Sequence, residues 1–354
     1  MHIPDGYLSP STCAVFYAAS APFWYVASQK VRRLISGRFV PLISVFAAFS
    51  FVIMMFNVPL PGGTSGHAVG ATLVTVVLGP WAAIVAVSVA LAIQALFFGD
   101  GGILAFGANV FNMAIVMPLV AHAVYRLVAG DGCANGRRRV VGAALAGYVA
   151  INAAAFCASL EFGVQPLFFH AADGTPLYAP YGLEIAIPAM MVGHLLIAGP
   201  AEALVTALAV GYLMRTNPQL LEFASPSRVT PGLRPRLAWL WGGIAALVVL
   251  APVGLLAAGT AWGEWNPADP EDWPLPSVPE GLKALSGLWQ APIPDYAMPF
   301  LGEGTVAQVM GYVLSAAVGA TLLAAIGLLL RRVFSRGGQG DEAPQSTDQR
   351  GMVS

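Results

Sequence analysis

Long apolar stretches alternate with short polar or basic stretches along most of the chain. A helix needs about 20 apolar residues to cross the hydrocarbon layer of a membrane. One apolar stretch, at 66–79, is short and glycine-rich. It meets the following stretch at Gly79-Pro80, an uncharged turn. The pattern predicts an all-α polytopic membrane protein with nine spans, near residues 11–28, 40–57, 66–79, 81–98, 103–128, 140–162, 184–213, 238–260 and 305–330.

The composition supports this interpretation. Of the 354 residues, 57% are hydrophobic and 10% are charged, and the mean hydropathy is +0.71. A soluble globular protein carries about 25% charged residues. The three cysteines, Cys13, Cys133 and Cys157, are far apart and form no CxxC motif, so they signal neither a disulfide framework nor a thiolate metal site. These observations exclude a soluble enzyme, a secreted disulfide scaffold and a nucleic-acid binder.

Basic residues predict the orientation of the chain in the membrane. Lysine and arginine collect in cytoplasmic loops. With nine spans and an external N-terminus, every one of the 17 basic residues except Lys283 falls on the cytoplasmic side. The C-terminus is then cytoplasmic, and Met1 and His2 lie on the outer face. The acidic residues Asp269, Glu271, Asp272, Glu280 and Asp295 lie in the long loop before the last span, on the outer side.

The order of the segments suggests two modules. Residues 1–215 form a transmembrane core of about seven helices, and residues 216–237 form a cytoplasmic linker rich in Pro, Ser and Arg. Residues 238–335 form a segment with two further transmembrane helices, which bracket an external loop at 261–304. The polar tail at 336–354 is predicted to be disordered.

The N-terminus carries the most specific chemistry. The first basic residue is Lys30, which is not the pattern of a signal peptide, so we expect the mature chain to begin at Met1. The α-amino group of Met1, the peptide nitrogen of His2 and the Nδ1 atom of His2 can then bind one metal ion in a plane, through a five-membered and a six-membered ring. Loss of the peptide proton and planar nitrogen coordination both favour Ni²⁺ or Cu²⁺.

His67 is the candidate fourth donor. It follows Pro61-Gly62-Gly63-Thr64-Ser65-Gly66, a loop on the same predicted face as Met1. Pro4-Asp5-Gly6 predicts a tight turn that folds the terminus over the core, and Asp5 is the carboxylate expected nearest the site. The alternative is a frayed N-terminus, with His67 capping the third helix.

Other polar residues are weaker candidates. Glu202 lies within the seventh span, and an intramembrane carboxylate is a functional candidate by default; the alternative is a hydrogen-bonded role in helix packing or a contact with a partner subunit. Polar packing contacts are expected for His122 and His194, and solvent contact for His170.

Two common motifs are missing from the sequence. The chain has no P-loop, because its two lysines follow Gln29 and Leu282, and it has no HExxH motif.

Several of these residues together carry a family resemblance. The opening Met1-His2-Ile3-Pro4-Asp5-Gly6-Tyr7-Leu8-Ser9-Pro10, with Pro61-Gly62-Gly63-Thr64 before His67, resembles the nickel/cobalt-specific S subunit (NikM/CbiM family) of energy-coupling factor transporters. Phe98-Gly99-Asp100-Gly101-Gly102, Gly107-Ala108-Asn109 and Asn112-Met113 are similar to the middle segment of that family. The resemblance covers residues 1 to about 215. The segment 238–335 is similar, more loosely, to the NikN/CbiN-type accessory component, which is fused here to the S subunit.

The resemblance implies a function. Such a subunit captures Ni²⁺ or Co²⁺ outside the bacterial cytoplasmic membrane, through ligands that fall on Met1, His2 and His67. It has no enzyme activity and no resident cofactor, because the metal is its cargo. A scaffold T subunit and two cytoplasmic ATPases are its implied partners, besides membrane lipid, and this agrees with the missing P-loop.

Three alternatives stay open from the sequence. The metal could be Co²⁺ for cobalamin synthesis, although the planar four-nitrogen site favours Ni²⁺. The chain could be a stand-alone metal channel or carrier, although it shows little of the polar pathway that this requires. It could also be a membrane enzyme that uses its external histidines, for which Asp5 is the only nearby carboxylate.

Overall fold

The computed structural model describes residues 1–34, 39–61, 63–130, 136–222, 237–257, 259–268, 273, 275 and 277–336. In this part of the chain a helix lies at each of the nine predicted spans, and the only sheet is one short hairpin. A helix is the expected form, since apolar surroundings leave backbone groups no partners outside their own segment. The all-α fold class is confirmed. Much of the predicted linker (223–236), the tail (337–354) and the acidic residues Asp269, Glu271 and Asp272 lie outside the described residues.

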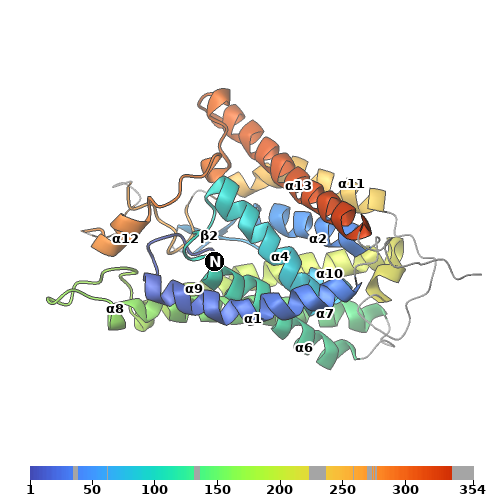
Figure 1. The fold of residues 1–354 in the computed structure, drawn as a ribbon, viewed down its shortest axis with the longest axis horizontal. Coiled ribbons are helices and arrows are strands. Elements are labelled where there is room, and N and C mark those ends of the chain that lie inside the picture. The colour runs from blue at the N-terminus through green and yellow to red at the C-terminus, as the bar shows by residue number, and fades with distance from the viewer. Residues whose placement is uncertain are drawn as a thin grey trace, which may run out of the picture.

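The core is a bundle of helices, three of which continue as π-helical turns (Figure 1). Its elements are α1 (Pro10–Leu34), α2 (Phe39–Met54), β1 (Val58–Leu60), β2 (Thr64–Gly66), α3 (Ala71–Leu78), α4 (Pro80–Ile93) with η1 (Gln94–Phe98), α5 (Phe106–Asn109) with η2 (Val110–Val116) and α6 (Met117–Ala129), α7 (Gly136–Gly163), α8 (Gln165–Phe168), α9 (Leu183–Gly193) with η3 (His194–Ala198), α10 (Gly199–Thr216) and η4 (Pro218–Glu222).

The C-terminal segment contains α11 (Leu237–Leu250), η5 (Ala251–Leu256), α12 (Glu280–Leu285), η6 (Pro294–Tyr296), η7 (Pro299–Leu301) and α13 (Thr305–Arg336). Helices α11 and α13 both pack against α2. The segment between them includes α12, which lies at the end of the molecule where α1 begins (Figure 1).

Six helical stretches of the described chain are long and apolar enough to cross a membrane, which makes this a multi-pass membrane protein. They are Pro80–Phe98, Phe106–Ala129, Gly136–Phe168, Leu183–Thr216, Leu237–Leu256 and Thr305–Leu330. The prediction of a third span at 66–79 was wrong in length. Helix α3 has eight residues, or about 12 Å of rise, and the residues before it form a hairpin strand and an extended segment that carries His67.

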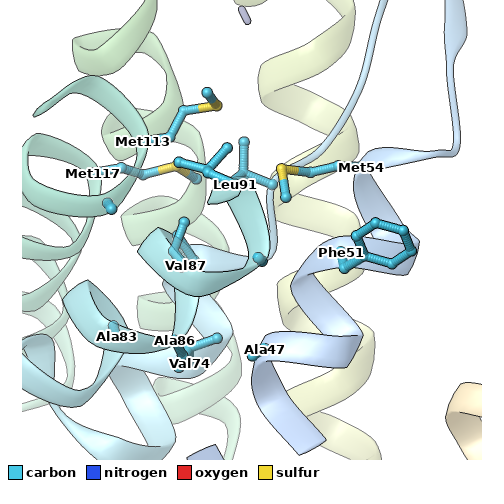
Figure 2. Packing of buried hydrophobic residues seen from close by; sticks show 14 of the residues in the cluster. Ala47, Phe51, Met54, Val74, Ala83, Ala86, Val87, Leu91, Met113 and Met117 are labelled. Carbon is cyan, nitrogen blue, oxygen red and sulfur yellow. The ribbon is translucent and has the colours of Figure 1, made fainter. Parts of the chain in front are cut away.

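Small residues allow the helices to approach closely. Ala47 on α2 and Ala83 and Ala86 on α4 lie where these helices meet, and larger side chains such as Val74 and Leu91 belong to the same buried cluster (Figure 2). Such close contacts are typical of helix association in membranes.

Two runs of small residues, 142–147 in α7 and 316–320 in α13, contain glycines that pack inside the molecule. A Cβ atom at Gly147 would meet Glu202 and Thr206 of α10 at 3.3 Å. One at Gly319 would meet the ring of Phe51 on α2 at 2.1 Å. These glycines therefore contact neighbouring helices of the same chain.

Candidate metal centre

The N-terminal loop is buried between the core and the α11–α13 loop of the C-terminal segment. Met1 is 5% exposed and His2 is 3% exposed. Asn109 holds Ile3, the residue after His2, by both of its backbone groups. The Asn109 Oδ1 atom accepts from Ile3 N at 2.7 Å, and its Nδ2 atom donates to Ile3 O at 3.0 Å. Gly102 N also donates to Ile3 O, at 2.9 Å. The frayed terminus considered above is therefore not what the structure contains.

Asp5 and Gly6 form the turn that brings the terminus back over the core. The Asp5 carboxylate accepts hydrogen bonds from Ile103 N and Ala105 N, each at 3.0 Å. Gly6 has a φ of +94°, a conformation that a side chain disfavours. Asp5 thus fastens the loop, and it is not the carboxylate nearest the two histidines, contrary to the sequence-based expectation.

His67 reaches the same place from the other side. Strands β1 and β2 pair antiparallel, with Val58 opposite Gly66, and the chain leaves β2 directly into His67. The His67 Nδ1 atom lies 3.1 Å from the carbonyl oxygen of Ala68. A donating Nδ1–H at this contact leaves the lone pair on Nε2, which faces the N-terminal loop. His67 does not cap α3, because the N-cap position is Gly70 and it has no side-chain cap.

The two histidine side chains meet in the buried space. His2 Nδ1 and His67 Nε2 are 3.2 Å apart, and the rings stack with centroids 4.9 Å apart. With metal–nitrogen bonds of about 2.0 Å, adjacent donors of a square-planar complex are about 2.8 Å apart. The observed spacing is close to that value, so the pair fits two neighbouring positions around one ion.

Both imidazoles are held in the neutral, metal-binding form. Burial and the nearby Met1 ammonium lower the pKa of His2 to about 3. The same two causes, in the same order, lower the pKa of His67 well below its ordinary value. Neutral imidazole is the form that binds metal.

Two carboxylates contact the predicted donors. Asp100 Oδ1 lies 3.0 Å from His2 Nδ1, and Glu264 Oε1 accepts from the Met1 ammonium at 3.2 Å. Burial raises the pKa of Glu264 to about 7, although the Met1 ammonium and the backbone amide of His2 oppose that shift. Burial also raises the pKa of Asp100, against a hydrogen bond from Tyr296.

Glu202 supports the segment that carries His67. Its side chain is fully buried in α10, and its Oε2 atom accepts from Val69 N at 2.8 Å and from Gly70 N at 3.0 Å. The other candidates lie elsewhere. His194 Nδ1 contacts Met190 O at 2.7 Å within its own helical stretch, His170 is exposed, and His122 has a partner of its own.

Sequence analysis identified the residues at the centre of this site and missed those around it. No group of three or more His, Cys, Asp or Glu side chains is arranged to hold a metal within the described ranges, and the predicted donor set uses two backbone nitrogens instead. Asp100 and Asn109 were noted only as part of a motif, without a role. Glu264 lies 263 positions from Met1, and no local pattern could have linked the two.

Comparison with protein families finds two matches in the chain. Residues 2–220 match the family described as the cobalt uptake substrate-specific transmembrane region, CbiM. Residues 236–336 match the PDGLE domain.

Two relatives match this chain over most of its length. The fused nickel transport protein NikMN of Rhodobacter capsulatus is 54% identical, over 96% of this chain and 100% of the relative. The probable fused nickel transport protein LarMN of Lactiplantibacillus plantarum is 46% identical, over 89% of this chain and 93% of the relative. A solved structure of a truncated transition metal transporter is 55% identical, with a TM-score of 0.57, over 61% of this chain and 99% of that one.

Proposed function

The chain belongs to the CbiM family of cobalt uptake substrate-specific transmembrane regions, and from that premise we propose that it captures Ni²⁺ at the outer face of the cell membrane. Membership makes it a component of a metal transporter rather than a catalytic enzyme. The resemblance to energy-coupling factor S subunits adds the finer part of the proposal. In it, a scaffold T subunit and two ATPases, all separate chains, drive release of the metal into the cytoplasm.

One observation carries the proposal: the buried His2–His67 pair, with the terminal amine beside it. His2 Nδ1 and His67 Nε2 are 3.2 Å apart. The terminal amine and the peptide nitrogen of His2 complete a planar set of four nitrogens. Their closeness follows from covalent structure, because consecutive backbone nitrogens and the imidazole close five- and six-membered rings on one ion.

The donor set favours Ni²⁺ over Co²⁺. Four nitrogens in a plane suit Ni²⁺, whose binding promotes loss of the peptide proton. High-spin Co²⁺ prefers tetrahedral or octahedral surroundings, which two planar chelate rings do not offer. The names of the two full-length relatives, both nickel transport proteins, agree with this choice.

Metal binding by the purified full-length protein tests the proposal. Calorimetry and visible absorption would compare the chain that begins at Met1 with a variant that carries one extra N-terminal residue. This extension keeps every side chain and moves the free amine out of the chelate. We expect tight Ni²⁺ binding and a square-planar absorption band in the native chain, and loss of both in the extended chain.

Unchanged affinity in the extended chain would show that Met1 is not a ligand. Tighter binding of Co²⁺ than of Ni²⁺ would reverse the choice of metal. Reconstituted vesicles supply the second test: the chain alone should not accumulate Ni²⁺, and uptake should need the ATPases and the T subunit. Flux through the chain alone would favour a channel or carrier instead.

A further inference from the structure

The C-terminal segment touches Met1 directly and contacts residues that adjoin His2 and His67. Glu264 contacts the amine of Met1 directly. Tyr296 donates to the Oδ2 atom of Asp100, whose other oxygen faces His2. The third contact is made through the backbone just before His67.

That backbone contact fixes the strand from which His67 emerges. Ser65 N donates to Thr260 O at 3.1 Å, and Thr64 Oγ1 donates to the same oxygen at 2.7 Å. Ser65 lies in β2, two residues before His67. The position of His67 therefore depends on residues of the C-terminal segment as well as on its own hairpin.

The contact through Tyr296 has the backbone features of a functional site. Asp295 and Tyr296 have φ values of +52° and +59°, which non-glycine residues rarely adopt and which cluster at such sites. Gln94 is fully buried, and its Nε2 donates to both Asp100 Oδ2 and the Tyr296 hydroxyl. The strained turn thus places the Tyr296 hydroxyl in hydrogen-bond contact with Asp100, the carboxylate beside His2.

Glu264 is the member of this set closest to the predicted chelate. Its side chain is 22% exposed, and the side chain of Met1, whose amine it contacts, is fully buried. Glu264 is therefore in contact with one of the four predicted donor nitrogens, the terminal amine.

The charge of a bound metal ion explains why a carboxylate lies beside the predicted site. A divalent ion bound to one deprotonated peptide nitrogen leaves a net charge of +1 in a largely buried space. Burying a charge without a partner is costly. Two carboxylates beside the predicted chelate, Asp100 from the core and Glu264 from the C-terminal segment, offset that charge.

We propose that Glu264, supplied by the C-terminal segment, is a positioning residue for the metal: its carboxylate orients the terminal amine before metal binds and stays beside the bound ion as an uncoordinated counter-charge. This inference rests on the proposed function. It gives the fused segment a direct part in metal capture, because the site lacks this counter-charge without it.

The Glu264→Gln substitution in the full-length protein tests the inference. We expect the affinity for Ni²⁺ to fall by about 10- to 100-fold, the usual effect of losing an outer-shell partner, with an unchanged position of the visible Ni²⁺ band. Glu264→Asp should recover part of the affinity. The matched control is Glu303→Gln, which removes the same charge from an exposed residue of the same external loop and should bind Ni²⁺ like the wild type.

A second readout needs no metal. The α-amine would be labelled with an amine-reactive ester, and the N-terminal peptide would be quantified by mass spectrometry. We expect several-fold faster labelling in Glu264→Gln than in the wild type or in Glu303→Gln, because the ion pair that shields the amine is gone.

Ni²⁺ binding by Glu264→Gln that is as tight as in the wild type, or tighter, would overturn the inference, and so would an unchanged labelling rate. These results differ from failure of the proposed function. That failure would appear as tight binding by the chain with an extra N-terminal residue, whatever residue occupies position 264.

Discussion

Gly102 passes the N-terminal loop so closely that a side chain would not fit. A Cβ atom there would lie 2.0 Å from Asp5 Oδ1 and 2.5 Å from Asp5 N. The backbone of Gly102 also donates to Ile3 O. The absence of a side chain is therefore a condition for placing Met1 and His2 in the site.

Replacing Gly102 by Ala should push the N-terminal loop away from the core. We expect the affinity for Ni²⁺ to fall by about 10- to 100-fold, as for loss of other outer-shell supports, measured by calorimetry on the full-length protein. Gly211→Ala is the control, since a Cβ atom there has no neighbour within 4 Å. Equal affinities in the two variants would contradict the expectation.

At the scale of residues, the sequence alone was enough to select the candidate donors but not the residues around them. Met1, His2 and His67 were chosen because donor chemistry depends only on residue type and on adjacency in the chain. The structure places the two histidine side chains in contact, while metal binding itself stays a prediction. Asp100 and Glu264 could not be found in this way, since their roles depend on which segments the fold brings together.

At the scale of elements, α10 holds the segment that carries His67. Glu202 accepts the amide hydrogens of Val69 and Gly70, and these are the residues that connect His67 to α3. An intramembrane carboxylate used in this way secures an extended segment that lacks helical hydrogen bonds of its own.

Glu202→Ala should therefore weaken Ni²⁺ binding as well as stability. Each buried amide left without a partner costs about 1–3 kcal/mol, and the His67 segment is the part that shifts. Glu161→Ala is a suitable control, because Glu161 is also buried but accepts from Asn112, away from His67. Thermal unfolding and Ni²⁺ titration of both variants separate the effects: both should lose stability, and only Glu202→Ala should lose affinity.

The sequence predicted the helices better than the segment that leads to the site. Long apolar stretches gave every helical span, because length and hydrophobicity suffice for that assignment. The stretch 66–79 is equally apolar, but its first part is extended and buried inside the molecule. Strands of three residues, such as β1 and β2, are too short to show a period.

At the scale of the whole molecule, the C-terminal segment is fixed to the core through α13 and α2. Gly319 faces Phe51, and the Tyr312 hydroxyl donates to Met55 O at 2.9 Å. This contact sets where the α11–α13 loop, with Glu264, meets the N-terminus.

Gly319→Leu should separate these helices. Overpacking of a close contact typically costs about 1–3 kcal/mol, and we expect a lower free energy of unfolding together with weaker Ni²⁺ binding, since Glu264 moves with the segment. Ala325→Leu adds a larger side chain at an exposed position of the same helix and should change neither property. Comparable unfolding curves for the two variants would show that the α13–α2 contact does not fix the segment.

The ion pair between Met1 and Glu264 also bears on how the protein is made. The two residues are 263 positions apart, and a ribosome adds about 5–20 residues per second, so roughly 13–50 s of synthesis separate them. Met1 therefore gains this contact only long after its own synthesis. Through that interval the N-terminal loop already has partners in the core, Asn109 and Gly102, and only the ion pair with Glu264 waits for the rest of the chain.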